Sequence, residues 1–173
     1  MSKKTTFLLA AVCFLVPALG LTAAGLDNLT ALMVDLPGWE ADEADGADMT
    51  AEGVRAVTVF RSYRNGDRKF EPTILFGTEA SSNWMPDYKE GYKLESPEGV
   101  MEVRRVNGFL VYEMFETEGG SGGIVVLLQE AKPGSGGGAV FAISFEGMSR
   151  EEAMKTAQRF SWARMKEQVG RLK

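Results

Sequence analysis

Acidic side chains dominate the charged residues of this chain, and many of them gather in one segment. The 173 residues include 24 Asp and Glu against 19 Lys and Arg, and residues 25–52 hold eight acids and no base. Part of this segment matches an EF-hand calcium loop at its third, fifth, sixth and twelfth positions, which are Glu43, Asp45, Gly46 and Glu52. The first position, which normally supplies a carboxylate, is Ala41. We therefore expect a solvated acidic loop, and calcium binding by residues 40–52 is left open.

Carboxylates can also carry catalysis by themselves, because glycoside hydrolysis needs two acids and no other residue type. No acid pair stands in a catalytic context in this sequence, and the S-x-x-K motif of a Ser-Lys pair is absent. Histidine is absent as well, and the one cysteine, Cys13, lies inside an apolar N-terminal run. Ser-His-Asp and Cys-His pairs and imidazole metal ligands are therefore excluded. We predict a protein that is not an enzyme, with no catalytic, cofactor-binding or metal-binding residues.

Two glycine-rich stretches, residues 119–123 and 133–139, invite comparison with phosphate-binding loops. The second fits the pattern G-x-G-x-x-A from Gly134. A dinucleotide-binding loop must follow a strand and open a helix, so that backbone N–H groups face the pyrophosphate. The segment that follows here has the pattern of a strand, so both stretches are predicted to be hairpin loops.

Methionine and aromatic side chains are the remaining candidates for a site. Thioethers bind copper(I) where they cluster, but no M-x-M or M-x-x-M occurs, so the methionines are predicted to fill the core. Residues 78–92 form a polar segment that we expect to be a loop, and large aromatic side chains in such a loop suit a binding hot spot. Packing of these side chains back onto the sheet is the alternative. The candidate partner-binding residues are Trp84, Met85, Tyr88 and Tyr92.

The N-terminus has the layout of a secretory signal peptide. Lys3 and Lys4 precede an apolar run over residues 7–21, and small residues follow it. We expect cleavage after Ala24, which leaves residues 25–173 as a single domain that is periplasmic or secreted. An uncleaved membrane anchor is the alternative, since the apolar run approaches the length that spans a bilayer. Cleavage would remove the only cysteine and two lysines from the working protein.

Most of the elements that must position these residues are predicted to be strands. Asn-Gly between alternating apolar runs indicates a type I′ hairpin, because both turn positions need a positive φ; this occurs at Asn65-Gly66 and Asn107-Gly108. Near-continuous apolar runs at residues 109–115, 124–128 and 139–145 predict central strands that are buried on both faces. Pro72 cannot donate a ladder hydrogen bond, so its strand is predicted to lie at an edge or to be bulged.

Apart from one helical turn that residues 78–92 could hold, helices are predicted near the two ends of the mature chain. Apolar residues between 26 and 36 have the spacing of a short amphipathic helix that ends at Pro37-Gly38. A C-terminal helix begins after Ser149, because Ser149 and Glu152 form the pattern of a capping box. Phe160-Ser161-Trp162 is a candidate interruption, where Ser161 would cap a second short helix.

The leader, the Asn-Gly hairpins and the closing helix with Phe160-Ser161-Trp162 together resemble small bacterial exported proteins. More distantly, the element order resembles that of the PsbP-like group. The resemblance implies an α+β sandwich with an extrinsic, mostly non-catalytic accessory role, and it carries over no functional residue.

Together these features predict an α+β domain with a mainly antiparallel sheet of six to seven strands, an N-terminal short helix and a C-terminal helix. The expected function is a binding protein of the bacterial envelope that contacts an unidentified envelope protein. The first alternative is a small-ligand or lipid carrier with a pocket between sheet and helix, and the second is a carboxylate-dependent hydrolase. Nucleic acid is not expected as a partner, because the chain is acidic. Membrane contact is expected only at the surface or through an uncleaved signal.

Overall fold

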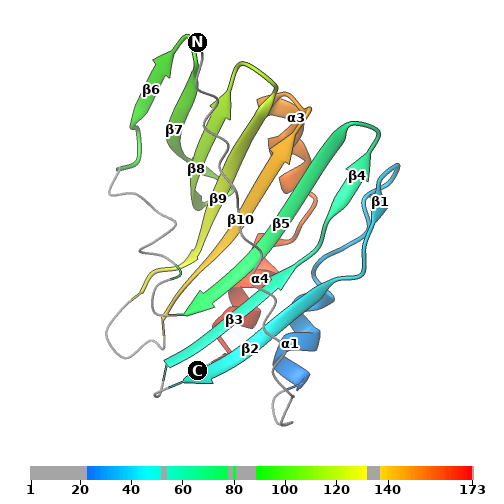
Figure 1. The fold of residues 1–173 in the computed structure, drawn as a ribbon. Coiled ribbons are helices and arrows are strands. Elements are labelled where there is room, and N and C mark those ends of the chain that lie inside the picture. The colour runs from blue at the N-terminus through cyan, green and yellow to red at the C-terminus, as the bar shows by residue number, and fades with distance from the viewer. Residues whose placement is uncertain (1–22, 52–53, 78–79, 81–88, 132–136, 173) are drawn as a thin grey trace, which may run out of the picture.

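The computed structural model describes residues 23–51, 54–77, 80, 89–131 and 137–172. These residues form one antiparallel sheet of ten strands with three short helices (Figure 1). The strands are β1 (Glu40–Ala41), β2 (Asp45–Ala51), β3 (Val54–Phe60), β4 (Tyr63–Asn65), β5 (Arg68–Gly77), β6 (Lys93–Ser96), β7 (Gly99–Val106), β8 (Phe109–Glu116), β9 (Ser121–Gln129) and β10 (Gly138–Glu146). The helices are α1 (Ala23–Thr30), α3 (Arg150–Ala157) and α4 (Trp162–Val169).

The last strand in the sequence, β10, lies in the middle of the sheet. The strand order is β1-β4-β5-β10-β9-β8-β7-β6, and β2 pairs with β3, which also pairs with β5. β3 and β4 therefore share one side of β5, with Phe60 opposite Thr73 and Tyr63 opposite Phe70. The six residues from Gly138 to Ile143 are all buried, which confirms burial on both faces for β10. In β8 and β9 the buried residues occur only at alternate positions, so the same prediction is wrong for residues 109–115 and 124–128.

The three helices lie on one face of the sheet, behind it in the view of Figure 1. The main hydrophobic core is between this face and the helices, and it centres on aromatic rings. The Phe160 ring lies 6.0 Å from that of Tyr63, 6.1 Å from that of Phe70 and 5.4 Å from that of Phe141. Phe160 comes from the junction between α3 and α4, so this junction closes the core.

The expected number of strands, six to seven, is wrong, although the α+β class and the antiparallel sheet are as predicted. The additional strands lie in polar segments. β2 was expected to be a solvated acidic loop, but it is an edge strand that pairs along its whole length with β3. β6 is also an edge strand, and all four of its residues are exposed. Such strands need backbone hydrogen bonds from one neighbour only, so apolar alternation does not mark them.

The helix near the N-terminus differs from the prediction, whereas the features predicted near the C-terminus are mostly confirmed. α1 runs from Ala23 to Thr30 rather than from 26 to 36, and turns follow it. The capping box at Ser149 and Glu152 is confirmed, with the Ser149 side chain accepting from the Glu152 N–H. The interruption at Phe160-Ser161-Trp162 is confirmed as well, but Ser161 makes no side-chain capping bond to α4.

Both predicted hairpins form, and one of them shifts by a residue. Asn107 and Gly108 have φ values of 51° and 84° and make the two-residue turn between β7 and β8. Between β4 and β5, Asn65 still pairs with Arg68, so the turn residues are Gly66 and Asp67. Only Gly66 has a positive φ there, 61°, which fits a type II′ turn.

Pro72 does not lie at an edge of the sheet. It lies in β5, between β10 and the pair β3 and β4. The sheet accommodates the missing N–H because the break between β3 and β4 falls beside Pro72, whose carbonyl accepts from Arg61 N–H at 3.2 Å. The predicted edge position of Pro72 is therefore wrong, and the pairing is interrupted between β3 and β4.

Candidate functional site

The helix-free face of the sheet carries apolar side chains that alternate with those of the core. In β10, Phe141 and Ile143 belong to the core cluster with the helices, so Val140 and Ala142 point to the opposite face. Both are nevertheless buried. The register aligns the same face on five strands in one row, which is Thr73, Ala142, Val125, Tyr112 and Val103.

A second row on this face runs parallel to the first, two residues further along each strand. It consists of Glu71, Ser144, Gly123, Met114, Met101 and Leu94. Gly123 has no side chain, so the row is open at its centre. A Cβ placed on Gly123 would lie 3.6 Å from its nearest neighbour, the Ile143 carbonyl oxygen, which is ordinary contact. Gly122 lacks this room, since a Cβ there would lie 2.2 Å from the Met114 carbonyl oxygen.

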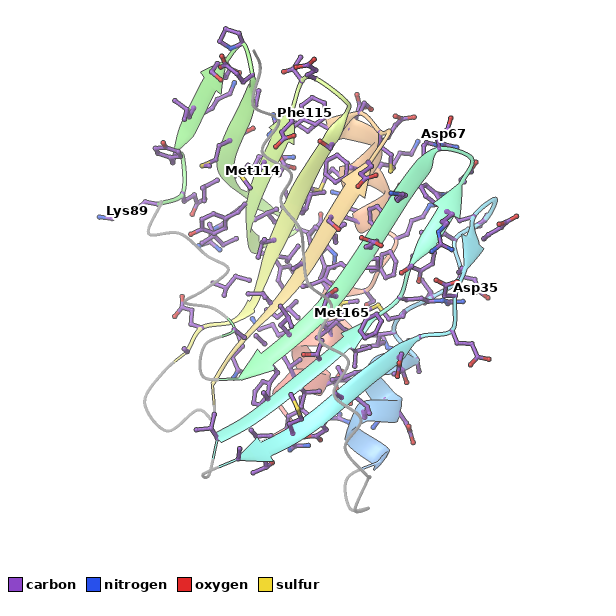
Figure 2. The ribbon with its side chains drawn as sticks, in the orientation of Figure 1. Asp35, Asp67, Lys89, Met114, Phe115 and Met165 are labelled. Carbon is purple, nitrogen blue, oxygen red and sulfur yellow. The ribbon has the colours of Figure 1, made fainter. Side chains whose placement is uncertain are left out.

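These two rows enclose an apolar hollow of about 300 Å³ around Gly123. Its lining side chains from the two rows are Glu71, Thr73, Met101, Tyr112, Met114, Val125, Ala142 and Ser144. Met114 is 56% exposed at its border, and Figure 2 shows it on the sheet face turned toward the viewer. The Ser144 hydroxyl donates to the Glu71 carboxylate at 3.3 Å, so the polar groups gather at the β5 end of the hollow.

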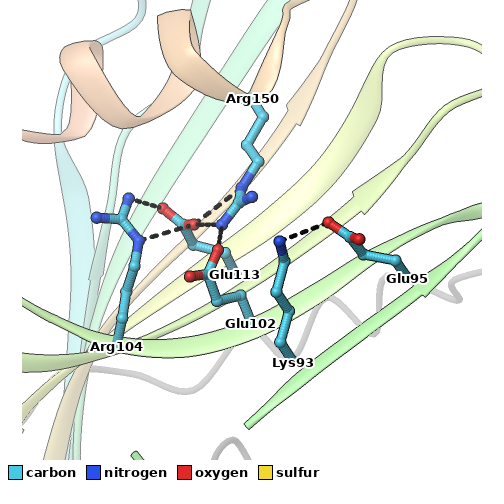
Figure 3. A network of polar contacts seen from close by, with 6 residues as sticks. All are labelled: Lys93, Glu95, Glu102, Arg104, Glu113 and Arg150. Atoms are coloured by element: carbon cyan, nitrogen blue, oxygen red, sulfur yellow. Dashed lines mark hydrogen bonds and ion pairs between the residues drawn. The ribbon is translucent and has the colours of Figure 1, made fainter. Parts of the chain in front are cut away.

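A second hollow of about 570 Å³ lies between α3 and the strands β7 and β8, and it is lined mainly by charges. Glu102 on β7 and Glu113 on β8 are directly opposite each other, an arrangement that repels by itself. Arg150, at the start of α3, contacts both carboxylates (Figure 3). Its Nε donates to Glu113 Oε2 at 2.9 Å, and Arg104 Nη2 donates to Glu113 Oε1 at 2.9 Å.

This network fastens α3 to the sheet. The Glu113 side chain is only 2% exposed, so its charge requires the two arginines. Two acids meet here in one cleft, as a carboxylate-dependent hydrolase would require. The hydrogen bond from Arg150 holds the pKa of the Glu102 carboxyl below its ordinary value, whereas a general acid needs a raised pKa. The arrangement therefore suits a structural clamp.

The lowered pKa of Glu102 predicts a loss of stability in acid. A carboxyl whose pKa is lower in the folded than in the unfolded state stabilises the fold above its unfolded value, about 4.3, and this stabilisation disappears as the pH falls through the folded value. We expect the free energy of unfolding, measured by urea titration, to drop between pH 5 and pH 3, as an order-of-magnitude window of about two pH units. Glu102→Gln should make the drop smaller. Glu118→Gln, at an exposed turn residue, is the control, and equal drops in all three proteins would contradict the assignment.

Of the predicted partner-binding residues, Trp84, Met85 and Tyr88 lie outside the described residues. Tyr92 is half-buried, and its carbonyl accepts from the Val103 N–H at 2.9 Å, so its backbone continues the pairing of β6 with β7. Of the glycine stretch 119–123, Gly119 and Gly120 lie in the β8–β9 turn as predicted, whereas residues 121–123 belong to strand β9 rather than to a loop. Of the stretch 133–139, residues 133–136 lie outside the described residues.

Two residues of the acidic segment 25–52 form ion pairs. Asp48 pairs with Arg55 at 2.6 Å and Asp35 with Arg61 at 2.7 Å. Within the described ranges, no group of three or more Asp, Glu, His or Cys side chains is placed to hold a metal ion. Glu52, the twelfth residue of the calcium-loop pattern, is not among them.

The apolar hollow was missed in the sequence because its parts are far apart in the chain. Met101 and Met114 are brought opposite each other by the β7–β8 hairpin, which a search for closely spaced methionines does not find. One feature of the sequence does indicate such a site. A glycine inside a strand pattern often marks a close approach of another group, and Gly122-Gly123 opens the apolar run 124–128.

No protein-family model matches this chain, and no match was found among curated proteins or solved structures. None of the helices in the described part of the chain has the length and apolar character needed to cross a bilayer.

Proposed function

We propose that this protein is a non-catalytic binding protein of the bacterial cell envelope that holds an apolar ligand on the helix-free face of its sheet. The observation that carries the proposal is the hollow around Gly123, whose lining is apolar except at one end. Hollows of this kind, with a few convergent polar groups, are the usual form of small-molecule sites, and about 300 Å³ is at the lower end of their range. Met101 and Met114 add adaptable side chains that suit ligands of varying shape.

The location differs from that expected for a carrier. A pocket between sheet and helix is the sequence-based hypothesis. A hollow of about 560 Å³ beside α4 has Arg105, Glu130 and Lys166 in its lining, and the hollow beside α3 is lined by Glu102, Arg104, Glu113 and Arg150. Desolvating these paired charges against an apolar ligand would be costly. In the hollow around Gly123 the charged side chain from the two rows is Glu71, at one end, so an apolar ligand is better accommodated there.

Filling the hollow tests this function. Gly123→Leu would place an isobutyl group in it without a backbone clash, and we expect it to weaken binding of the neutral fluorophore N-phenyl-1-naphthylamine at least about tenfold, by blocking the space that the probe occupies. The measurement is a fluorescence titration of the purified full-length protein. Native mass spectrometry of protein taken directly from envelope extracts adds a second readout, because a carrier should retain bound mass.

The matched control is Ala47→Leu, which adds the same side chain at an exposed position of β2 and should leave the affinity unchanged. Thermal melts of both variants establish that each is folded. Gly123→Val is the smaller substitution to use if Gly123→Leu melts at a lower temperature than the wild type. Equal probe affinity in the wild type and a folded Gly123 variant, or no binding by the wild type, would refute the proposal.

A protein partner is the second candidate, and the exposed edge at β6 favours it. Leu94 is 53% exposed on this edge strand, next to Met101 in the same row as Met114. An edge strand with an exposed apolar side chain can pair with an added strand. Capture of an envelope protein by the wild type but not by Leu94→Asp would favour this function over ligand binding.

A further inference from the structure

The polar end of the hollow is acidic. Glu71 lines the hollow from β5, and the next row on the same face carries Glu146, Lys69 and Arg64 beside it. Lys69 Nζ pairs with Glu146 Oε2 at 2.8 Å and Arg64 Nη1 with Asp42 Oδ1 at 3.7 Å, so both bases already have a carboxylate partner. Among the residues that the structure describes, Glu71 has no cation within ion-pair distance, and its carboxylate accepts the Ser144 hydroxyl.

The other end of the same row is apolar. Beyond Gly123 the row continues with Met114, Met101 and Leu94, of which Met114 and Leu94 are more than half exposed. Glu71 on β5 and Met114 on β8 are separated by three strand spacings, or roughly 14 Å at about 4.8 Å each. The hollow therefore lies across the strands, with a carboxylate near one end and thioethers near the other.

We propose that the ligand is an elongated amphiphile with a positively charged head group. Its apolar body would lie over Gly123 against Met114 and Met101, and its cationic head would lie beside the Glu71 carboxylate. This inference rests on the proposed function, and it specifies the class of ligand. Charge complementarity carries it, since the charged side chain that lines this hollow from the two rows is an acid.

An anionic amphiphile fits this site less well. Its head would meet Glu71, and the nearest base on that side, Lys69, is held by Glu146. At the opposite end of the face, Arg105 is likewise paired, with Glu90 at 2.9 Å. The chain's net charge of −5 adds to the repulsion at longer range.

The test compares two amphiphiles with the same chain, dodecyltrimethylammonium and dodecyl sulfate, below their micellar concentrations. Each displaces N-phenyl-1-naphthylamine from the full-length protein. We expect the cation to bind at least about fivefold more tightly than the anion, and we expect Glu71→Gln to remove most of this difference. Glu43→Gln makes the same change of charge at an exposed residue away from the hollow and should preserve the preference. Added salt should reduce it.

The outcomes separate this inference from the proposed function. If both amphiphiles bind with equal affinity and Gly123→Leu weakens both, the cationic ligand class is wrong and the apolar site stands. A preference for dodecyl sulfate, or a preference for the cation that Glu71→Gln leaves unchanged, also overturns the ligand class. If neither amphiphile nor the neutral probe binds, or if Gly123→Leu affects none of them, the proposed function itself fails.

Discussion

Phe160→Ala should lower the free energy of unfolding by about 4 kcal/mol, which corresponds to a fall in Tm of roughly 10 °C for a domain of this size. Phe160 is 3% exposed, and its ring contacts those of Tyr63, Phe70 and Phe141. Removing the ring deletes its buried surface and leaves a cavity between rings that come from three strands. Urea denaturation followed by circular dichroism measures the change.

Phe60→Ala is the matched control for this substitution. Phe60 lies on the helix-free face of β3 and is 44% exposed, so its loss should cost less than about 1 kcal/mol. Comparable losses in the two variants would contradict the placement of the core on the helix face alone. Phe160 lies between α3 and α4. A large effect of Phe160→Ala would therefore show that the packing of both helices depends on this side chain.

Arg150→Met should lower the free energy of unfolding by about 2 to 3 kcal/mol, because it leaves Glu113 buried with one arginine and removes the cation between Glu102 and Glu113. Methionine preserves most of the apolar volume of the arginine stem, so the loss reports mainly on charge. Chemical denaturation at neutral pH measures it, and Arg164→Met, at an exposed position of α4, should change stability by less than about 0.5 kcal/mol.

A second substitution separates charge from packing in this network. Replacing Glu113 by leucine in the Arg150→Met background removes the carboxylate that has lost its partner, so the double variant should be more stable than Arg150→Met alone. Additive losses from the two substitutions would show instead that the carboxylate and the arginine act independently, and the description of Glu113 and Arg150 as a coupled clamp would then be wrong.

Local features of the fold could be predicted because they depend on residues within a few positions of one another. The Ser149–Glu152 capping box, the turn at Asn107-Gly108 and the break before Trp162 all formed where the sequence placed them. The burial of β10 on both faces followed from its continuous apolar run. Each of these signals is a short pattern with a direct backbone or solvation consequence.

Features that depend on a distant strand could not be predicted in this way. The acidic residues of β2 form a strand because β3 offers a complete ladder, although their own pattern indicates a loop. Pro72 lies inside the sheet because the neighbouring chain breaks beside it. Glu113 is part of an apolar strand pattern, and the meaning of its charge appears only when Arg150 is placed above it.

The sequence by itself determined the α+β class, the turn at Asn107-Gly108 and the exclusion of histidine chemistry, because composition and short-range patterns are sufficient for these. The tertiary structure decided the number of strands and the position of the candidate site. Strand register sets which side chains share a row, and it alone brings Glu71, Gly123 and Met114 together on one face. A shift of one residue would turn each of them to the other face, since side chains alternate along a strand.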